Sequence, residues 1–255
     1  METINLLNCN IAKVTMSETI SLVESYVDAG RFHLGCGINA DQIVKMNESH
    51  EFKDIIHKAD IIFADGMSLV VASRLLRKSL PERIGAIDLF EALLPVAAEK
   101  QYKIFLLGTK DRILEKAVNY YRLKYPGLKI SGYNNGYWSS GEEDTLVSKI
   151  NNCSPDFLFL GISSPKKENF IEKNRNKFQS VSFALGVGGT FDIHAGEYTR
   201  APIWMQKIGM EWFWRLLQEP KRMFWRYTVN NMKFLYLLMK DMVKSLKRSA
   251  ANKSS

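Results

Sequence analysis

Cysteine is scarce in this chain of 255 residues, and its three cysteines are far apart. Cys9, Cys36 and Cys153 form no C-x-x-C pair, which excludes a disulfide framework and a cysteine zinc site. A reducing compartment is therefore the expectation. The first residues also lack a basic segment followed by a long apolar run, so we expect no export signal.

Long apolar runs are missing as well. A membrane-spanning helix needs about 20 consecutive, mainly apolar residues. The nearest candidate, residues 234–239, is short and is bounded by Lys233 and Lys240. We expect the chain not to span a membrane.

Several signatures of cofactor and metal chemistry are absent. The dinucleotide fingerprint G-x-G-x-x-G does not occur, which argues against a nicotinamide enzyme, and neither does the G-x-S-x-G turn of many hydrolases. No Asp-x-Asp pair is available to hold a metal, and His33 and His194 lack the spacing of metal ligands. The sequence therefore predicts no metal site, no cofactor and a structural role for both histidines.

The net charge of +8 is unevenly distributed. Residues 1–199 carry 23 Lys and Arg against 24 Asp and Glu, whereas residues 200–255 carry 12 against 3. We therefore expect an anionic partner to meet the C-terminal segment.

Hydrophobic residues make up 46% of the chain, enough for a sizeable core. Apolar, β-rich runs alternate with helical patterns from about residue 31 to 185, which is typical of a parallel sheet covered by helices. We expect strands near residues 32–36, 61–64, 104–107, 129–132, 157–160 and 181–185, and helices near residues 17–27, 40–46, 67–76, 89–99, 111–124, 142–150 and 166–175.

The predicted fold class is α/β: a doubly wound, mostly parallel sheet with helices on both faces, plus a C-terminal helical appendage that docks on a membrane. Residues 1–199 would form the α/β domain, residues 200–248 the basic and aromatic appendage, and residues 249–255 a disordered end.

Polar and glycine-rich segments follow most of the predicted strands, where ligands bind in open parallel sheets. Asp65 follows four apolar residues, so its carboxylate should project into the crevice as a general base. The alternative is an N-cap of the next helix. Gly186, Gly188 and Gly189 can bring backbone amides close to a phosphate, and the alternative there is a tight turn without a ligand.

The appendage holds four of the five tryptophans together with Arg215, Arg222 and Arg226, which recur at spacings of seven and four. Aromatic residues favour the headgroup boundary of a membrane and arginine suits phosphate, so this segment predicts docking on anionic lipid. A solvated basic face over an aromatic core is the first alternative. A nucleic-acid patch is disfavoured, because the aromatics cluster with leucine and methionine and are not arranged for base stacking.

Together these segments resemble the WecG/TagA/CpsF family of bacterial glycosyltransferases, over nearly the whole chain. The segments that carry the resemblance are FADGM at residues 63–67, ERIGAIDL at 82–89, FLLG at 105–108, LGISSPKKE at 160–168, GVGGTFD at 186–192, RAP at 200–202 and GMEWFWRLLQEPKR at 209–222.

The resemblance implies an inverting transferase that moves an N-acetylmannosamine-type sugar from UDP to a polyprenyl-diphosphate-linked N-acetylglucosamine, for bacterial cell-surface polysaccharides. It implies that Asp65 is the catalytic base. The other residues that we assign are Gly108, Lys166, Glu168, Gly188, Gly189 and Asp192 to the donor, and Asn39, Arg83, Asp88, Arg215, Arg222 and Arg226 to the acceptor.

Two positions depart from the family pattern. Gly37 stands where members often carry Thr, so no hydroxyl contact can be carried over, and Lys167 stands where many carry Gln. The details of sugar recognition are therefore open.

The expected partners are a UDP-sugar, a lipid-linked sugar and an anionic membrane surface, with a homo-oligomer as an option away from the membrane and no nucleic acid. The expected location is cytoplasmic, on the inner face of the plasma membrane. The appendage would order over the pocket at the membrane, as indicated by the change of charge near residue 200. The alternatives are a non-catalytic membrane-binding module and a nicotinamide-dependent sugar-nucleotide oxidoreductase.

Overall fold

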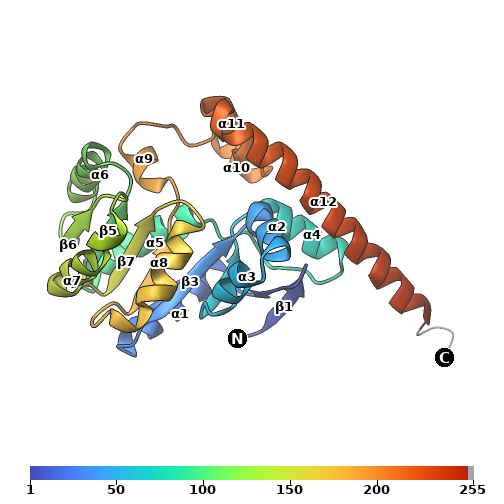
Figure 1. The fold of residues 1–255 in the computed structure, drawn as a ribbon, viewed down its shortest axis with the longest axis horizontal. Helices are drawn as coiled ribbons and strands as arrows, with labels where there is room; N and C mark the ends of the chain where they lie inside the picture. The colour runs from blue at the N-terminus through green and yellow to red at the C-terminus, as the bar shows by residue number, and fades with distance from the viewer. Residues whose placement is uncertain (252–255) are drawn as a thin grey trace.

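A six-stranded parallel sheet lies at the centre of the protein (Figure 1). The computed structural model describes residues 1–251, with the side chains of all of these except Arg222, Trp225, Arg226 and residues 245–251. The strand order is β4-β3-β8-β7-β5-β6. The strands are β3 (His33–Ile38), β4 (Ile61–Ala64), β5 (Lys103–Gly108), β6 (Lys129–Asn134), β7 (Phe157–Gly161) and β8 (Phe183–Gly186).

The sheet forms where the sequence predicted strands, because both of its faces are buried. In β7, Phe157 and Phe159 pack into the core on one face, whereas Leu158 and Leu160 pack into the core on the other. Buried strands of this kind are read in a sequence as continuous apolar runs. The prediction of an α/β fold with a parallel sheet between two layers of helices is confirmed.

Helices cover both faces of the sheet (Figure 1). The helices that pack on one face are α1 (Met16–Asp28), α5 (Ala86–Glu99), α6 (Asp111–Lys124) and α9 (Thr190–His194). Those on the other face are α2 (Ala40–Glu48), α3 (His50–His57), α4 (Met67–Leu75), α7 (Glu143–Cys153) and α8 (Lys166–Asn174). Two short 3₁₀ helices, Ser140–Glu142 and Arg175–Lys177, flank α7 and α8.

Local signals account for the start of α1 but not for every element. Thr15 and Glu18 form the reciprocal capping box that their spacing predicted. A two-stranded antiparallel hairpin, β1 (Thr3–Leu6) and β2 (Cys9–Ala12), was not predicted, and neither was α3. Helix α5 begins at Ala86, earlier than predicted.

The C-terminal segment is helical, as predicted. It comprises α10 (Ile203–Lys207), α11 (Glu211–Gln218) and α12 (Pro220–Ala251), and Pro220 starts a new helix. The 32 residues of α12 span about 48 Å, and its end extends beyond the sheet domain (Figure 1). The predicted disordered end overlaps the last residues of α12, and residues 252–255 lie outside the described part.

Helix α12 is fastened to α2. Phe234 and Leu238 are buried in the core cluster that α2 shares. The amide of Asn230 donates to Asp41 at 2.5 Å, and Lys233 pairs with Glu48 at 2.6 Å. No helix within the described 251 residues combines the length and apolar character needed to cross a membrane.

Candidate active site

The carboxyl ends of the parallel strands bring the predicted site residues to one edge of the sheet. Asp65 follows β4, Asn39 follows β3, and Gly108 ends β5. The run from Gly186 to Gly189 leads from β8 into α9. This edge is where open α/β sheets bind ligands.

Asp65 holds its carboxylate toward the first turn of α5 and does not cap α4. Gly66 is the N-cap of α4, so the alternative role considered for Asp65 is not the one observed. Oδ1 of Asp65 instead accepts a hydrogen bond of 3.0 Å from the amide of Ala86. Burial raises the pKa of the Asp65 carboxyl above its ordinary value, although the Ala86 amide and the charge of Arg83 oppose the shift. A carboxylate of this kind is a stronger base than one in water.

Asn39 is placed beside Asp65 by its role at the start of α2. Its Oδ1 accepts from the amide of Gln42 at 3.3 Å, and the Gln42 side chain accepts from the amide of Asn39 at 3.1 Å. A side chain on Gly66, the residue after Asp65, would meet the Asn39 Cβ at 3.1 Å. Asn39 therefore has a local capping role as well as a position next to Asp65.

The glycine loop before α9 lies beneath the appendage. Gly188 has φ +56°, a left-handed conformation that favours glycine. A Cβ on Gly189 would lie 2.8 Å from the guanidinium of Arg215, so α11 places this arginine directly against the loop. The structure thus brings Arg215, which we assigned to the acceptor, to the loop that we assigned to the donor.

The predicted donor residues at β5 and β7 make the opposite part of the same edge. A Cβ on Gly108 would meet the backbone of Gly161 at 2.5 Å, so the two strands approach closely there. The hydroxyl of Thr109 donates to Asp192 at 2.8 Å and ties α9 to the end of β5. Lys166 donates to the carbonyl of Gly136 at 2.9 Å and lies 3.8 Å above the centre of the Trp138 ring.

Glu168 is more deeply buried than the predicted donor residues Lys166 and Asp192. It is 6% exposed and pairs with Lys167 at 3.2 Å. The pair lies beneath Gly186, where the lysine side chain occupies the space that a Cβ would need.

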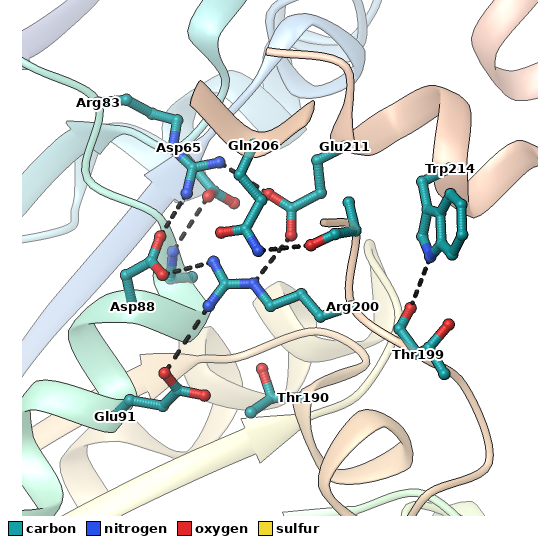
Figure 2. Close-up of polar contacts among 12 residues, drawn as sticks. Asp65, Arg83, Asp88, Glu91, Thr190, Thr199, Arg200, Gln206, Glu211 and Trp214 are labelled. Atoms are coloured by element: carbon teal, nitrogen blue, oxygen red, sulfur yellow. Dashed lines mark hydrogen bonds and ion pairs between the residues drawn. The ribbon is translucent and has the colours of Figure 1, made fainter. Parts of the chain in front are cut away.

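A network of ion pairs joins the appendage to α5 (Figure 2). Arg83 pairs with Asp88 and, at 2.9 Å, with Glu211 at the start of α11. Arg200 pairs with Asp88, with Glu211 at 3.1 Å and with Glu91 at 3.7 Å. We call these five residues the latch. The structure thus brings together the predicted Arg83 and Asp88, and adds Glu91, Arg200 and Glu211, which were not predicted as site residues.

The latch extends to α9 through His194. The ring of His194 lies 2.7 Å from Glu91 and 2.7 Å from the hydroxyl of Tyr121. A histidine interpreted as structural therefore connects the helix that follows the glycine loop to the ion pairs around Arg200.

Two signals pointed to the missed residues. Glu211 is one of only three acidic residues in the basic segment 200–255, and isolated opposite charges of this kind often form ion pairs. Glu91 is three residues after Asp88 on the same helix, so the two share a face.

Two predicted acceptor residues are not placed. The side chains of Arg222 and Arg226 lie outside the described residues. Within the described part of the chain, no group of three or more His, Cys, Asp or Glu side chains could hold a metal ion.

Comparison with known proteins agrees with this arrangement. A profile of the family described as "Glycosyl transferase WecG/TagA/CpsF family" matches residues 4–248. A protein of Bacillus subtilis (strain 168) is 31% identical over 243 residues, which are 94% of this chain and 93% of the relative. It is named N-acetylglucosaminyldiphosphoundecaprenol N-acetyl-beta-D-mannosaminyltransferase.

Relatives with the same name occur in other bacteria. One from Bacillus spizizenii (strain ATCC 23059 / NRRL B-14472 / W23) is 30% identical over 219 residues, covering 86% of this chain and 83% of the relative. One from Staphylococcus aureus (strain MW2) is 34% identical over 182 residues, covering 71% of this chain and 70% of the relative. With its sheet, its strand-end aspartate and a profile match along almost its full length, the chain belongs to the WecG/TagA/CpsF family and is a glycosyltransferase of the hexosyltransferase class.

Proposed function

We propose that this glycosyltransferase moves an N-acetylmannosamine-type sugar from UDP to a polyprenyl-diphosphate-linked N-acetylglucosamine, with inversion and without a metal ion. The relatives' names supply the sugar and the acceptor. The observation that carries the proposal is the carboxylate of Asp65, desolvated at the end of β4 and fixed by the Ala86 amide.

In the proposed reaction Asp65 takes the proton of the acceptor hydroxyl as its oxygen attacks the anomeric carbon. The bond between that carbon and the diphosphate oxygen breaks, and UDP leaves with the electron pair. Attack and departure lie on opposite faces of the sugar, so the configuration inverts. The raised pKa of Asp65 favours the proton transfer.

Charge on the departing diphosphate would be stabilised by the loop at Gly188 and Gly189 and by Arg215. The guanidinium lies against this loop, so a phosphate bound to the loop would meet it. Fixed donors aimed at developing charge contribute about 3–4 kcal/mol each in water-excluded sites. Lys166 would serve the nucleotide end, where its ammonium lies over Trp138.

The acceptor would approach over the latch. Arg83 and Arg200 are engaged with carboxylates in the structure, so a lipid diphosphate that binds them must compete with Glu211 or Asp88. Acceptor binding would therefore loosen the ion pairs that hold the appendage, which couples the position of the appendage to acceptor binding. Asn39, Arg222 and Arg226 remain predicted acceptor residues.

The appendage would dock on the anionic inner face of the plasma membrane. Large apolar side chains are exposed along all three of its helices: Ile203, Trp204, Ile208, Trp212, Phe213, Leu217, Phe224, Met232, Leu235, Tyr236, Met239 and Val243. Met232, Tyr236, Met239 and Val243 repeat at helical spacing on α12, on the side away from Phe234 and Leu238. Helices with such a stripe and flanking lysines lie in the membrane interface.

The reaction is tested with purified protein, a panel of UDP-sugars and a short-chain polyprenyl-diphosphate N-acetylglucosamine, with EDTA present. We expect turnover with one donor, inversion of the product linkage, and a loss of about 10²–10⁴ in kcat for Asp65→Asn. Binding of UDP should persist in the variant, which controls for folding. No turnover with any donor, or full activity of Asp65→Asn, would overturn the proposal.

Membrane docking is tested by flotation with vesicles of phosphatidylglycerol or of phosphatidylcholine alone. We expect binding to the anionic vesicles that weakens as salt rises. Tyr236→Glu with Met239→Glu should abolish it, whereas Leu123→Glu, at an exposed position on α6, should not. Vesicle binding without any sugar transfer would favour the membrane-binding module instead.

A further inference from the structure

A small cavity lies beneath the floor of the crevice, on the face of the sheet covered by α3 and α8. It has a volume of ≈ 20 Å³, about the room needed by one water-sized group. Its upper wall includes Gly37 and Gly186, which lie at the carboxyl ends of β3 and β8. Most of the remaining wall is apolar: Leu34, Ile55, Ile56, Ala59, Leu160 and Ile171.

Lys167 and Glu168 are the charged groups of this wall. Glu168 is 6% exposed, and Oε2 of its carboxylate accepts no hydrogen bond from any described group. Burial disfavours the charged form of Lys167, but Glu168 carries the pKa of the lysine above its ordinary value. Lys167 therefore keeps its charge. The carboxylate oxygens of Glu168 have acceptor capacity left, and the ammonium of Lys167 has donor capacity left.

A buried carboxylate oxygen without a hydrogen bond is costly, and an apolar pair of similar volume at this position would often be as stable or more stable. The fold alone therefore gives no reason for the pair. A ligand that donates a hydrogen bond to Glu168 gives one.

The position of the pair identifies the part of the substrate it meets. Gly186 begins the loop that ends at Gly189, where Arg215 lies and the proposed diphosphate binds. A Cβ on Gly37 would lie 3.3 Å from the Cβ of Asp65. The sugar must lie between the diphosphate and the base. Lys167 lies against Gly186 and lines the same cavity as Gly37, so it would lie under the sugar.

We propose that Lys167, Glu168 and the cavity form the subsite for the 2-acylamino group of the donor sugar. The amide N–H donates to Glu168, the acyl methyl group fills the cavity, and Lys167 donates to a neighbouring ring hydroxyl. This inference rests on the proposed function, since it takes the donor to be a nucleotide sugar.

The chemistry of the wall favours an acylamino group over the simpler substituents. A hydroxyl would leave the apolar room empty, and a carboxylate would face Glu168. The small volume of the cavity also favours a short acyl chain such as acetyl.

Titration calorimetry with UDP, UDP-mannose and UDP-N-acetylmannosamine tests the subsite. The last two donors differ only at the 2-substituent. We expect the unaltered protein to bind the acylamino donor about 10- to 100-fold more tightly than UDP-mannose. In Lys167→Met with Glu168→Leu, a replacement of both charges that keeps the volume, the ratio should fall to about one, with UDP affinity unchanged.

The matched control uses a second Lys–Glu pair, which joins the two helices that cover the cavity. Lys58, at the end of α3, pairs with Glu172 of α8 at a largely exposed position. Lys58→Met with Glu172→Leu should leave the ratio as in the unaltered protein. Ala59→Leu, which fills the cavity and keeps both charges, should lower affinity for the acylamino donor and not for UDP-mannose, and it stands in if the double variant is unfolded.

The outcomes separate this inference from the proposed function. Failure of all three nucleotides to bind would overturn both. Binding without preference for the acylamino donor, or a preference that survives in the double variant and in Ala59→Leu, would overturn the subsite alone.

Discussion

The sheet domain and the appendage are built in different ways. Residues 1–199 are almost neutral in charge, and their core is closed on both faces of the sheet. The appendage carries a net charge of +9 and buries few apolar side chains: Ala201, Met205, Met223, Phe234 and Leu238 among those described. The first region is held by its core, whereas the second is held largely by its contacts with the first.

The residues proposed for the reaction are divided between the sheet domain and the appendage. The proposed base and glycine loop belong to the sheet domain, whereas Arg200, Glu211 and Arg215 reach the site from the appendage. A site divided in this way can be completed or opened by moving the appendage, without unfolding the domain that holds the proposed nucleotide site.

The comparison is tested most severely by removing the appendage. A truncated protein that ends at Gly196 should keep its fold and bind UDP, because the sheet core lies before that residue. We expect its transfer to lipid-linked acceptor to fall by about 10³-fold or more, since Arg215 and the membrane contacts are lost together. Full activity of the truncated protein would show that the appendage takes no part in catalysis.

The contribution of a single appendage cation is tested with Arg215→Ala. We expect kcat to fall by about 10²-fold, because the guanidinium that lies against Gly189 would no longer meet the departing diphosphate. Lys207→Ala, which removes the same charge from an exposed position in α10, should change kcat less than twofold. Equal losses in the two variants would mean that only the total charge of the appendage matters.

Neighbouring residues of α12 separate its two proposed contacts. Phe234 is 4% exposed and packs on α2, so Phe234→Ala should lower the free energy of unfolding by about 3 kcal/mol. Leu235 is 48% exposed, so Leu235→Ala should leave stability nearly unchanged and weaken vesicle binding. Chemical denaturation and flotation measure the two effects, and a reversed result would contradict the orientation of α12.

The sequence predicted the sheet because buried parallel strands leave continuous apolar runs. It did not predict the first hairpin, whose turn places Leu7 at φ +50° and Asn8 at φ +67°. The usual signal for such a turn is Asn-Gly or Asp-Gly, and leucine is rarely found in this conformation.

The residues of the candidate site also include some that the sequence could predict and some that it could not. Strand-end residues such as Asp65 and Asn39 could be predicted, because the ends of parallel strands meet at one edge. The latch could not, since Arg200 and Asp88 are 112 residues apart and their contact depends on where the appendage docks. The proposed roles of Lys167 and Glu168 could not be predicted either, because the alternation of strand and helix patterns and the charges along the chain do not reveal a cavity.

The smallest effect that we expect is the effect of Arg83, a residue of the latch, on the pKa of Asp65, the proposed base. The charge of Arg83 holds the pKa of Asp65 lower than burial alone would set it. A protonated Asp65 cannot accept the acceptor's proton, so kcat/KM should fall as the pH drops through this pKa. In Arg83→Gln the pKa should rise further, and the acidic limb of the profile should move to higher pH.

Arg175→Gln is the control for this shift, because it removes the same charge at the opposite end of the strands, beside Asp60 and Phe32. Its acidic limb should coincide with that of the unaltered protein. A limb that stays in place in Arg83→Gln, or that moves to lower pH, would mean that a group other than Asp65 titrates there, because removing a neighbouring cation can only make a carboxylate harder to ionise.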